Sequence, residues 1–310
     1  MNTIYRVLPL ILIIAFAGCS SQSDEIEEPA PTQASVRQVS AEDLKLVNGQ
    51  VVYIPAYSNI FFADADAGKT WDLAVTMAIR NTDEDNPIII NSARFYDTDG
   101  NLVTDYVSEP LELAPLGTIN IVLERTDARG GAGANFIVDW AAETEAIEPV
   151  IETVMVSTSG TQGVGFTSPG KVISGDDLEL VTAQSVYVPA YSEIFFTDTE
   201  RTWDLAVTLA IHNTDSENPI TITSARYYDT DGNLVTEYIE EPVELNPWAT
   251  TGVVVERTDK SGGVGANFIV DWEADAGVSE PIIEAVMIST SGTQGLGFTG
   301  PGRVISQMPD

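Results

Sequence analysis

The sequence predicts an all-β protein that contains two tandem β-sandwich domains. Three observations lead to this prediction. A unit of about 130 residues occurs twice, large apolar residues recur at every second position within each unit, and clusters of Asp, Asn, Gly and Pro interrupt the apolar runs. A spacing of two is typical of strands, and turn clusters at intervals of about 8–12 residues are typical of sandwiches.

The duplication sets the domain organisation. The segment VYIPAYS at 52–58 returns as VYVPAYS at 186–192, and roughly two-thirds of the paired positions are identical. Each unit has the size of an ordinary domain, and no Gly/Ser linker separates the copies, so a closely coupled pair is expected. The predicted boundaries are 1–18 for a signal peptide, 19–39 for an acidic, Pro-containing and disordered tether, 40–173 for the first repeat, 174–305 for the second and 306–310 for a C-terminal tail.

Seven to nine short strands are expected in each repeat. In the segment 71–79, large apolar residues alternate with small or polar ones, which places them on one face of a strand. Further strands of the first repeat are predicted at 87–96, 102–107, 118–124, 135–141 and 150–157. The strand-turn-strand pattern around Tyr96 and Asp97 resembles immunoglobulin-like modules of bacterial envelope proteins, which implies an immunoglobulin-like sandwich.

The first 19 residues resemble the signal of a bacterial lipoprotein. Arg6 supplies a positive charge, residues 7–17 are apolar, and Cys19 follows the small residues Ala17 and Gly18. The apolar run is shorter than the about 20 residues that span a bilayer. The resemblance implies that Cys19 is lipidated; a plain signal peptide with an unrelated cysteine is the alternative. Ser20 resembles an outer-membrane sorting signal, so the predicted location is the bacterial cell envelope, lipid-anchored to the outer membrane, with its periplasmic or surface face left open.

Both repeats resemble one uncharacterised bacterial family. The motifs that carry the resemblance are VYIPAY at 52–57, NTD at 81–83, YDTDG at 96–100, GANFIV at 133–138 and SGTQG at 159–163. They are similar to those of the domain of unknown function 3124 family, and the resemblance covers both units. The resemblance implies a family relationship, but it implies no activity, cofactor or site.

Composition excludes several classes of function. The 310 residues include 47 acids and 14 bases, a net charge of −33, and such a chain repels a phosphate backbone, so no nucleic-acid partner is expected. One cysteine excludes a disulfide framework, and one histidine excludes a histidine-rich metal cluster.

The aspartate-rich turns are candidates for calcium sites. Alternating acids and amides at 97–101 and 229–233 offer the oxygen ligands that calcium prefers. The sixth and twelfth residues from Asp97 are Leu102 and Ser108, so the EF-hand pattern fails, and a hairpin turn is the favoured interpretation. The candidate calcium ligands are Asp97, Asp99, Asn101, Asp229, Asp231 and Asn233.

The segment STSGTQG, repeated letter for letter at 157–163 and 289–295, is a candidate ligand loop. Its small hydroxyl and amide side chains suit hydrogen bonds to a sugar or a peptide edge, with Trp140, Trp272, Tyr57 or Tyr191 as a stacking face. A plain turn beside core aromatics is the favoured alternative. The candidate residues are Ser157, Ser159, Thr161, Gln162, Ser289, Ser291, Thr293 and Gln294.

Catalysis has little support in the sequence. His212 is the only histidine, its counterpart in the first repeat is Arg80, and its place at a strand end favours an exposed side chain. Carboxylate pairs such as Glu124 with Asp139 are to be expected by accident among so many acids. We therefore expect no enzyme and no cofactor, with calcium as the one candidate ion.

The expected function is that of a lipid-anchored cell-envelope protein that acts as a non-catalytic binding or structural module. The expected partners are the membrane, through Cys19, and an envelope protein or polysaccharide. Two linked copies raise avidity for a repetitive ligand. The alternatives are a calcium-stabilised adhesion or assembly module and a carboxylate-dependent envelope hydrolase.

Overall fold

The fold is described from a computed structural model, which covers residues 36–61, 70–158, 163–174, 178–195, 201–289 and 295–309. The predicted signal peptide, Cys19 and nearly all of the predicted tether lie outside these ranges. Both repeats belong to one compact unit, Pro31–Asp310. Within the described ranges, no helix is long and apolar enough to cross a bilayer.

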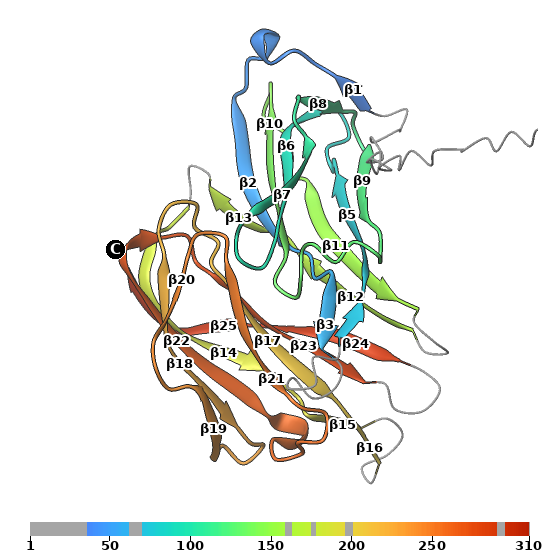
Figure 1. The fold of residues 1–310 in the computed structure, drawn as a ribbon. Coiled ribbons are helices and arrows are strands. Elements are labelled where there is room, and N and C mark those ends of the chain that lie inside the picture. The colour runs from blue at the N-terminus through green and yellow to red at the C-terminus, as the bar shows by residue number, and fades with distance from the viewer. Residues whose placement is uncertain are drawn as a thin grey trace, which may run out of the picture. The chain divides into compact units, whose positions relative to one another are not determined.

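The first repeat is a β-sandwich of antiparallel strands (Figure 1). One sheet has the order β1-β8-β6-β10-β2-β13, with β7 also paired to β6, and the other has the order β12-β11-β5-β9. A small hairpin pairs β3 with β4. The elements are β1 (Val36–Gln38), the 3-10 turn η1 (Ala41–Asp43), β2 (Asn48–Pro55), β3 (Asn59–Phe61), β4 (Thr70–Asp72), β5 (Ala74–Arg80), β6 (Ile88–Tyr96), β7 (Leu102–Val107), β8 (Leu111–Leu113), β9 (Thr118–Leu123), β10 (Asn135–Ala142), β11 (Val150–Ser157), β12 (Val164–Pro169) and β13 (Lys171–Ser174).

The second repeat has the same arrangement of strands. Its larger sheet has the order β19-β18-β22-β14-β25, with β20 paired to β18, and its smaller sheet has the order β21-β17-β23-β24. The elements are β14 (Val181–Pro189), β15 (Glu193–Phe195), β16 (Thr202–Asp204), β17 (Ala206–His212), β18 (Ile220–Tyr228), β19 (Leu234–Ile239), β20 (Val243–Leu245), β21 (Thr250–Val255), the 3-10 turn η3 (Gly263–Gly265), β22 (Asn267–Val278), β23 (Ile282–Ser289), β24 (Leu296–Pro301) and β25 (Arg303–Pro309).

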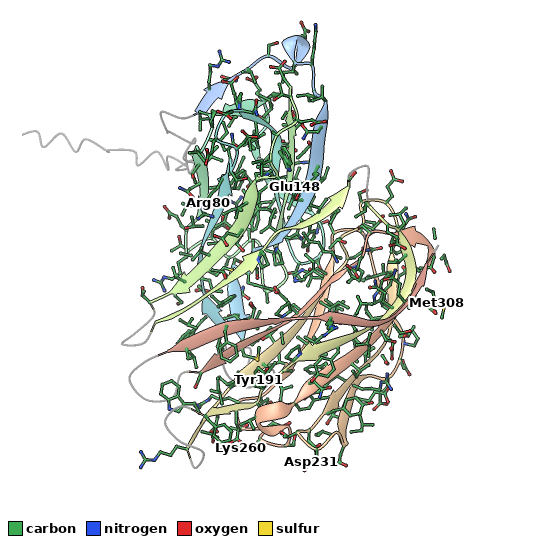
Figure 2. The ribbon with its side chains drawn as sticks, turned by 180° about the vertical axis from the view of Figure 1, so that it is seen from behind. Arg80, Glu148, Tyr191, Asp231, Lys260 and Met308 are labelled. Atoms are coloured by element: carbon green, nitrogen blue, oxygen red, sulfur yellow. The ribbon has the colours of Figure 1, made fainter. Side chains whose placement is uncertain are left out.

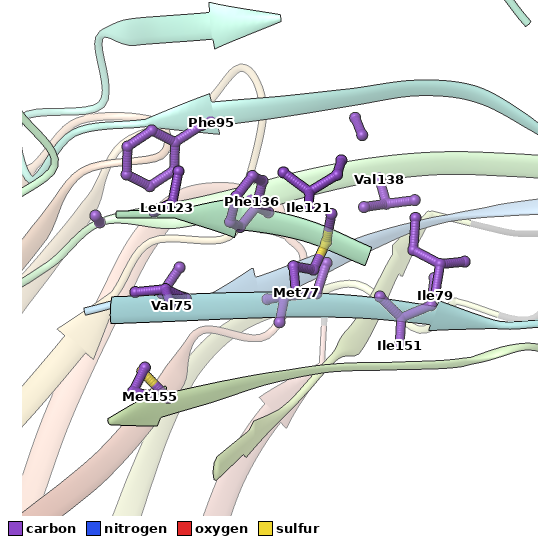
Figure 3. Close-up of a cluster of buried hydrophobic side chains, with 14 of the residues drawn as sticks. Val75, Met77, Ile79, Phe95, Ile121, Leu123, Phe136, Val138, Ile151 and Met155 are labelled. Atoms are coloured by element: carbon purple, nitrogen blue, oxygen red, sulfur yellow. The ribbon is translucent and has the colours of Figure 1, made fainter. Parts of the chain in front are cut away.

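The core of each sandwich lies between its two sheets. In β5 the alternate residues Val75, Met77 and Ile79 have no exposed surface, and they face Phe136 and Val138 of β10 in the opposite sheet (Figure 3). The spacing of two in the sequence therefore follows directly from packing on one face of each strand. Burial of such side chains contributes about 1.5–3 kcal/mol each.

The predicted fold class is confirmed: the described chain is all-β and contains two tandem sandwiches. The predicted strands at 102–107 and 150–157 match β7 and β11 residue for residue. The expected seven to nine strands per repeat is too low, because the described ranges contain twelve strands in the first repeat, β2 to β13, and twelve in the second, β14 to β25; β1 lies in the predicted tether. Several of the additional strands, such as β3, β4 and β8, are edge and hairpin pieces of three residues, in which alternation has no room to show.

Two neighbouring strands of the second repeat, β17 and β23, depart from the one-sided pattern. β17 is buried along its whole length, whereas Ala74, Thr76 and Arg80 of its counterpart β5 are only partly buried. Ala206 and Ala210 of β17 belong to the same hydrophobic cluster as Tyr57 and Phe166 of the first repeat. The outer face of the smaller sheet of the second repeat is therefore covered by the first repeat.

Candidate functional site

The aspartate turns are hairpins that satisfy their own carboxylates. Asp97 accepts hydrogen bonds from the backbone N–H of Asp99 at 3.0 Å and of Asn101 at 2.8 Å, and Gly100 takes the left-handed conformation with φ 82°. Hydrogen bonds from Asn233 hold the pKa of Asp229, in the twin turn, below its ordinary value. Among the described residues, no group of three or more His, Cys, Asp or Glu is arranged to hold a metal ion. Calcium binding at Asp97, Asp99, Asn101, Asp229, Asp231 and Asn233 stays a prediction.

The repeated ligand segment is only partly described. Ser157 and Ser289 end β11 and β23, and each side chain is 1% exposed. The aromatic residues proposed as a stacking face divide: Trp140, Trp272 and Tyr57 are buried, and only Tyr191 is partly exposed. The other candidates lie outside the described residues: Ser159, Thr161, Gln162, Ser291, Thr293 and Gln294.

The expectation that His212 is exposed is wrong. Its side chain has no exposed surface, because two tyrosines of the first repeat cover it. The hydroxyl of Tyr53 lies 2.9 Å from Nδ1 of the imidazole, and the hydroxyl of Tyr57 lies 3.0 Å from Nε2. These tyrosines precede His212 by 159 and 155 residues, so the local sequence around His212 gave no sign of them.

His212 is the centre of a buried polar cluster between the repeats. Thr250 Oγ1 lies 2.8 Å from Nδ1 and donates to the carbonyl oxygen of Gly133 at 2.8 Å. On the other side of the ring, the Tyr57 hydroxyl also donates to Glu284 Oε1 at 2.6 Å, and Ser168 Oγ donates to the same oxygen at 3.0 Å. We call this set the His212 cluster; it consists of Tyr53, Tyr57 and Ser168 of the first repeat and His212, Thr250 and Glu284 of the second.

Burial sets the protonation of the His212 cluster. Loss of hydration lowers the pKa of His212 to about 3, so the imidazole is neutral at pH 7. Burial also raises the pKa of the Glu284 carboxyl, although the hydrogen bonds from Tyr57 and Ser168 oppose the rise. A neutral imidazole offers one donor and one acceptor; the hydroxyl of Tyr57 lies at Nε2, and those of Tyr53 and Thr250 lie at Nδ1, to meet them. The ring serves as a hydrogen-bond bridge between the repeats rather than as a base open to a substrate.

Aromatic and backbone contacts extend the interface beside the His212 cluster. Trp248, with φ 63°, stacks on Tyr53 with ring centroids 6.3 Å apart and lies 6.0 Å from the ring of Tyr96. Asn135 Nδ2 donates to the carbonyl oxygen of Trp248 at 3.2 Å. The unusual backbone of Trp248 therefore projects its ring onto the first repeat and its carbonyl toward a buried donor.

An ion pair forms the far end of the same interface. Lys171 of β13 pairs with Glu280, and Gln184 donates to the other carboxylate oxygen of Glu280 at 2.7 Å. Burial lowers the pKa of Lys171, against the charge of Glu280, which raises it. Both side chains are about one-third exposed, so the ion pair contributes more to the specificity of the contact than to its stability.

The hairpin tip of the first repeat touches the second repeat, and this contact is open to a matched test. A Cβ built on Gly100 lies 2.6 Å from the carbonyl oxygen of Pro247, whereas one on Gly232, at φ 81°, meets nothing within 4 Å. Gly100→Ala and Gly232→Ala both bear the cost of a left-handed alanine, about 1 kcal/mol. In urea denaturation, only Gly100→Ala should lower the free energy of unfolding by a further amount of about 1 kcal/mol or more, because its new methyl group overpacks the contact with Pro247. Equal losses in the two variants would show that the tip of the first repeat is free.

A cleft of about 310 Å³ opens at the interface, lined by residues of both repeats. The first repeat contributes Phe61, Thr98 and Gly133, and the second contributes Thr208 and Thr251 among others. The Thr208 hydroxyl is buried and has no hydrogen-bond partner in the described structure. The cleft therefore combines apolar walls with several hydroxyl groups, a mixture typical of small ligand sites.

The acid pairs considered for hydrolysis are Glu124 with Asp139 and, in the second repeat, Glu256 with Asp271, and the aspartate of each accepts hydrogen bonds within its own sheet. Asp139 accepts a hydrogen bond from Asn91 at 3.0 Å, and Asp271 is bonded by Ser185, Ser224 and Arg226. Glu124 follows β9 in the smaller sheet, while Asp139 belongs to β10 in the larger one. Carboxylates placed in two different sheets in this way do not by themselves form a catalytic pair across a cleft.

Comparison with known proteins identifies the repeats. A single family model, described as protein of unknown function (DUF3124), matches residues 49–173 and again residues 183–305. Neither a curated protein nor a solved structure matches the chain. Because the two matches cover most of the sequence and coincide with the two sandwiches, the chain belongs to the DUF3124 family and carries the family's domain twice.

Proposed function

We propose that this chain is a lipid-anchored protein of the bacterial cell envelope whose two sandwiches together form a non-catalytic binding module. The observation that carries the proposal is the cleft lined by both repeats, since neither sandwich alone provides its walls. Thr208 lines that cleft, and its buried hydroxyl has no hydrogen-bond partner among the described residues. A ligand that reaches this hydroxyl would recover the about 1–3 kcal/mol that a buried hydroxyl without a partner costs.

The chemistry of the cleft favours an uncharged, hydroxyl-rich ligand. Thr98, Thr208, Thr250 and Thr251 line it together with Phe61, and no Lys, Arg, Asp or Glu is among its lining residues. With a net charge of −33, the chain repels anionic polymers. A neutral stretch of envelope polysaccharide fits both facts, and an envelope protein segment is the rival ligand. The proposal includes no cofactor and no reaction, because the only imidazole is buried and neutral.

Binding is tested with the chain from Ser20 onward immobilised and exposed first to purified cell-wall polysaccharide and then to solubilised envelope proteins. The expected result is saturable retention of polysaccharide that Thr208→Val weakens at least about tenfold, because the hydroxyl makes its bond only to the ligand. Thr76→Val, the same change at the matching position of β5, should leave binding unchanged. Polysaccharide retention that Thr208→Val leaves unchanged would contradict binding in the cleft. Repeating the assay in calcium and in chelator tests the calcium-stabilised alternative, and release of cleaved polysaccharide would favour the hydrolase.

Anchoring is tested separately in a cell fractionation. Wild-type chain is expected in the outer-membrane fraction with an acylated amino terminus, and Cys19→Ala is expected to lose the acyl groups, because the thiol is the proposed lipidation site. Mass spectrometry of the isolated protein measures both. An unmodified Cys19 in a membrane fraction would contradict the lipid anchor and leave the cleft proposal standing.

A further inference from the structure

The interface between the repeats joins two different surfaces of the same fold. The first repeat contributes a surface that we call face A, and the second contributes one that we call face B. Face A of the first repeat consists of Tyr53, Tyr57, Tyr96, Ile137, Lys171 and Ile173. Face B of the second repeat consists of His212, Trp248, Thr250, Glu280, Ile282 and Glu284.

A contact between unlike faces of two like domains is head-to-tail, and it leaves one face of each kind unused. The second repeat has its own face A, and the first repeat has its own face B. The duplication supplies their residues by sequence position. The open face A consists of Tyr187, Tyr191, Tyr228, Ile269, Arg303 and Ile305, and the open face B consists of Arg80, Leu116, Thr118, Glu148, Val150 and Glu152.

The open face A retains the chemistry of the occupied one. All three tyrosines are kept, and Tyr191 lies 6.4 Å from the ring of Phe298, as Tyr57 lies 6.2 Å from that of Phe166. Apart from Arg303 in place of Lys171, its residues differ in exposure: Ile305 is 57% exposed, whereas its counterpart Ile173 is 7% exposed. The apolar surface that the second repeat covers on the first is thus presented again, uncovered.

The open face B keeps the backbone turn and both glutamates of the occupied one, while Arg80 and Leu116 stand in place of His212 and Trp248. Leu116 has φ 54°, close to the 63° of Trp248, and its side chain is 64% exposed. Glu148 accepts a hydrogen bond from Gln50 at 2.5 Å, as Glu280 does from Gln184 at 2.7 Å. Arg80 replaces His212 and bonds Glu152 at 2.8 Å. Arg80 and Glu148 both lie on the first sandwich, and Tyr191 lies on the second (Figure 2).

We propose that a second copy of this chain occupies these faces, so that face A of one molecule binds face B of the next in a head-to-tail series. Each contact within the chain has a counterpart between molecules. Arg303 meets Glu148 as Lys171 meets Glu280, Leu116 covers Tyr187 as Trp248 covers Tyr53, and Arg80 donates to the tyrosine hydroxyls in place of His212. The inference stands apart from the proposed cleft ligand and anchor, because it rests only on the two sandwiches.

The charge of the chain opposes this association in dilute salt. Two molecules that each carry a net charge of −33 repel one another, and added salt screens that repulsion. Association should therefore strengthen from dilute buffer to about 0.5 M salt, the opposite of a contact held by ion pairs.

Sedimentation velocity of the chain from Ser20 onward, which includes the whole compact unit, tests the proposal. In about 0.5 M salt, wild type should form dimers and larger species as its concentration rises toward about 1 mM. Ile305→Glu on face A and Leu116→Asp on face B should each weaken association at least about tenfold, since both place a charge in a contact that is apolar. Both side chains are exposed, so neither change should lower the melting temperature.

Mixing the two variants makes the test specific. Ile305→Glu keeps an intact face B and Leu116→Asp keeps an intact face A, so the mixture should form dimers and nothing larger. Two outcomes would overturn the proposal: wild type that stays monomeric throughout, or a mixture that associates no better than either variant alone.

Discussion

Tyr57→Ala is expected to lower the free energy of unfolding by about 3–5 kcal/mol, the cost of removing a buried aromatic ring. The ring has no exposed surface, packs 6.2 Å from Phe166, and places its hydroxyl between His212 and Glu284. Removing it leaves a cavity and takes one hydrogen-bond partner from each of two buried groups. Urea denaturation of the whole chain measures the loss.

The chain contains its own control for this change. Tyr191 has the same local sequence and the same aromatic neighbour, but it lies on the open face A and is only partly buried. Tyr191→Ala should therefore cost clearly less, about 1–2 kcal/mol. Tyr57→Phe and Tyr191→Phe separate the hydroxyl from the ring: the first should cost about 1–3 kcal/mol and the second under about 0.5 kcal/mol. Equal costs at the twin positions would mean that the repeats do not pack on each other.

Removing one titrating group from the His212 cluster should reveal the pH dependence of the other. The folded pKa of His212, about 3, lies below its ordinary 6.5, so its contribution to stability is present above pH 6.5 and is lost as the pH falls toward 3. The folded pKa of Glu284 lies above its ordinary 4.5, so its contribution is present below pH 4.5 and is lost as the pH rises. In the wild type, the two effects oppose each other.

The two single variants should consequently have slopes of opposite sign. Glu284→Gln leaves the His212 effect, and stability should fall by about 1.4 kcal/mol for each pH unit below 6.5. His212→Gln leaves the Glu284 effect, and stability should fall as the pH rises above 4.5. Carboxylates whose pKa the fold lowers, such as Asp83, change the stability with pH only below about pH 4, so they do not affect the range from pH 4.5 to 6.5. The urea denaturation midpoints of the two variants, measured between pH 4.5 and 6.5, test these slopes. Slopes of the same sign would contradict the protonation states assigned to His212 and Glu284.

Local sequence predicted the sandwiches well because each strand's alternation reports on the face it packs against. The segment 71–79 illustrates this: Val75, Met77 and Ile79 point into the core as their spacing indicates. The turn prediction at 97–101 also agrees with the structure, because Asp97 bonds the backbone of the two residues that close the turn.

The interface between the repeats was not predictable in this way. The segments around Tyr57 and Tyr191 are nearly identical, yet only the first is covered. Burial there depends on a partner surface about 155 residues further along the chain. The signals that did exist were the differences between the copies: Arg80 against His212, and Leu116 against Trp248, place a charge and a smaller side chain on the face that stays open.

Differential scanning calorimetry of the chain from Ser20 onward tests most directly whether the two sandwiches are one cooperative body. The His212 cluster, the stacking of Trp248 on Tyr53 and the shared hydrophobic cluster predict a single transition in which the calorimetric and van't Hoff enthalpies agree. Tyr57→Ala should lower the temperature of that transition and broaden or split it. Two separate transitions in the wild-type chain, each with the enthalpy of one sandwich, would contradict the buried interface.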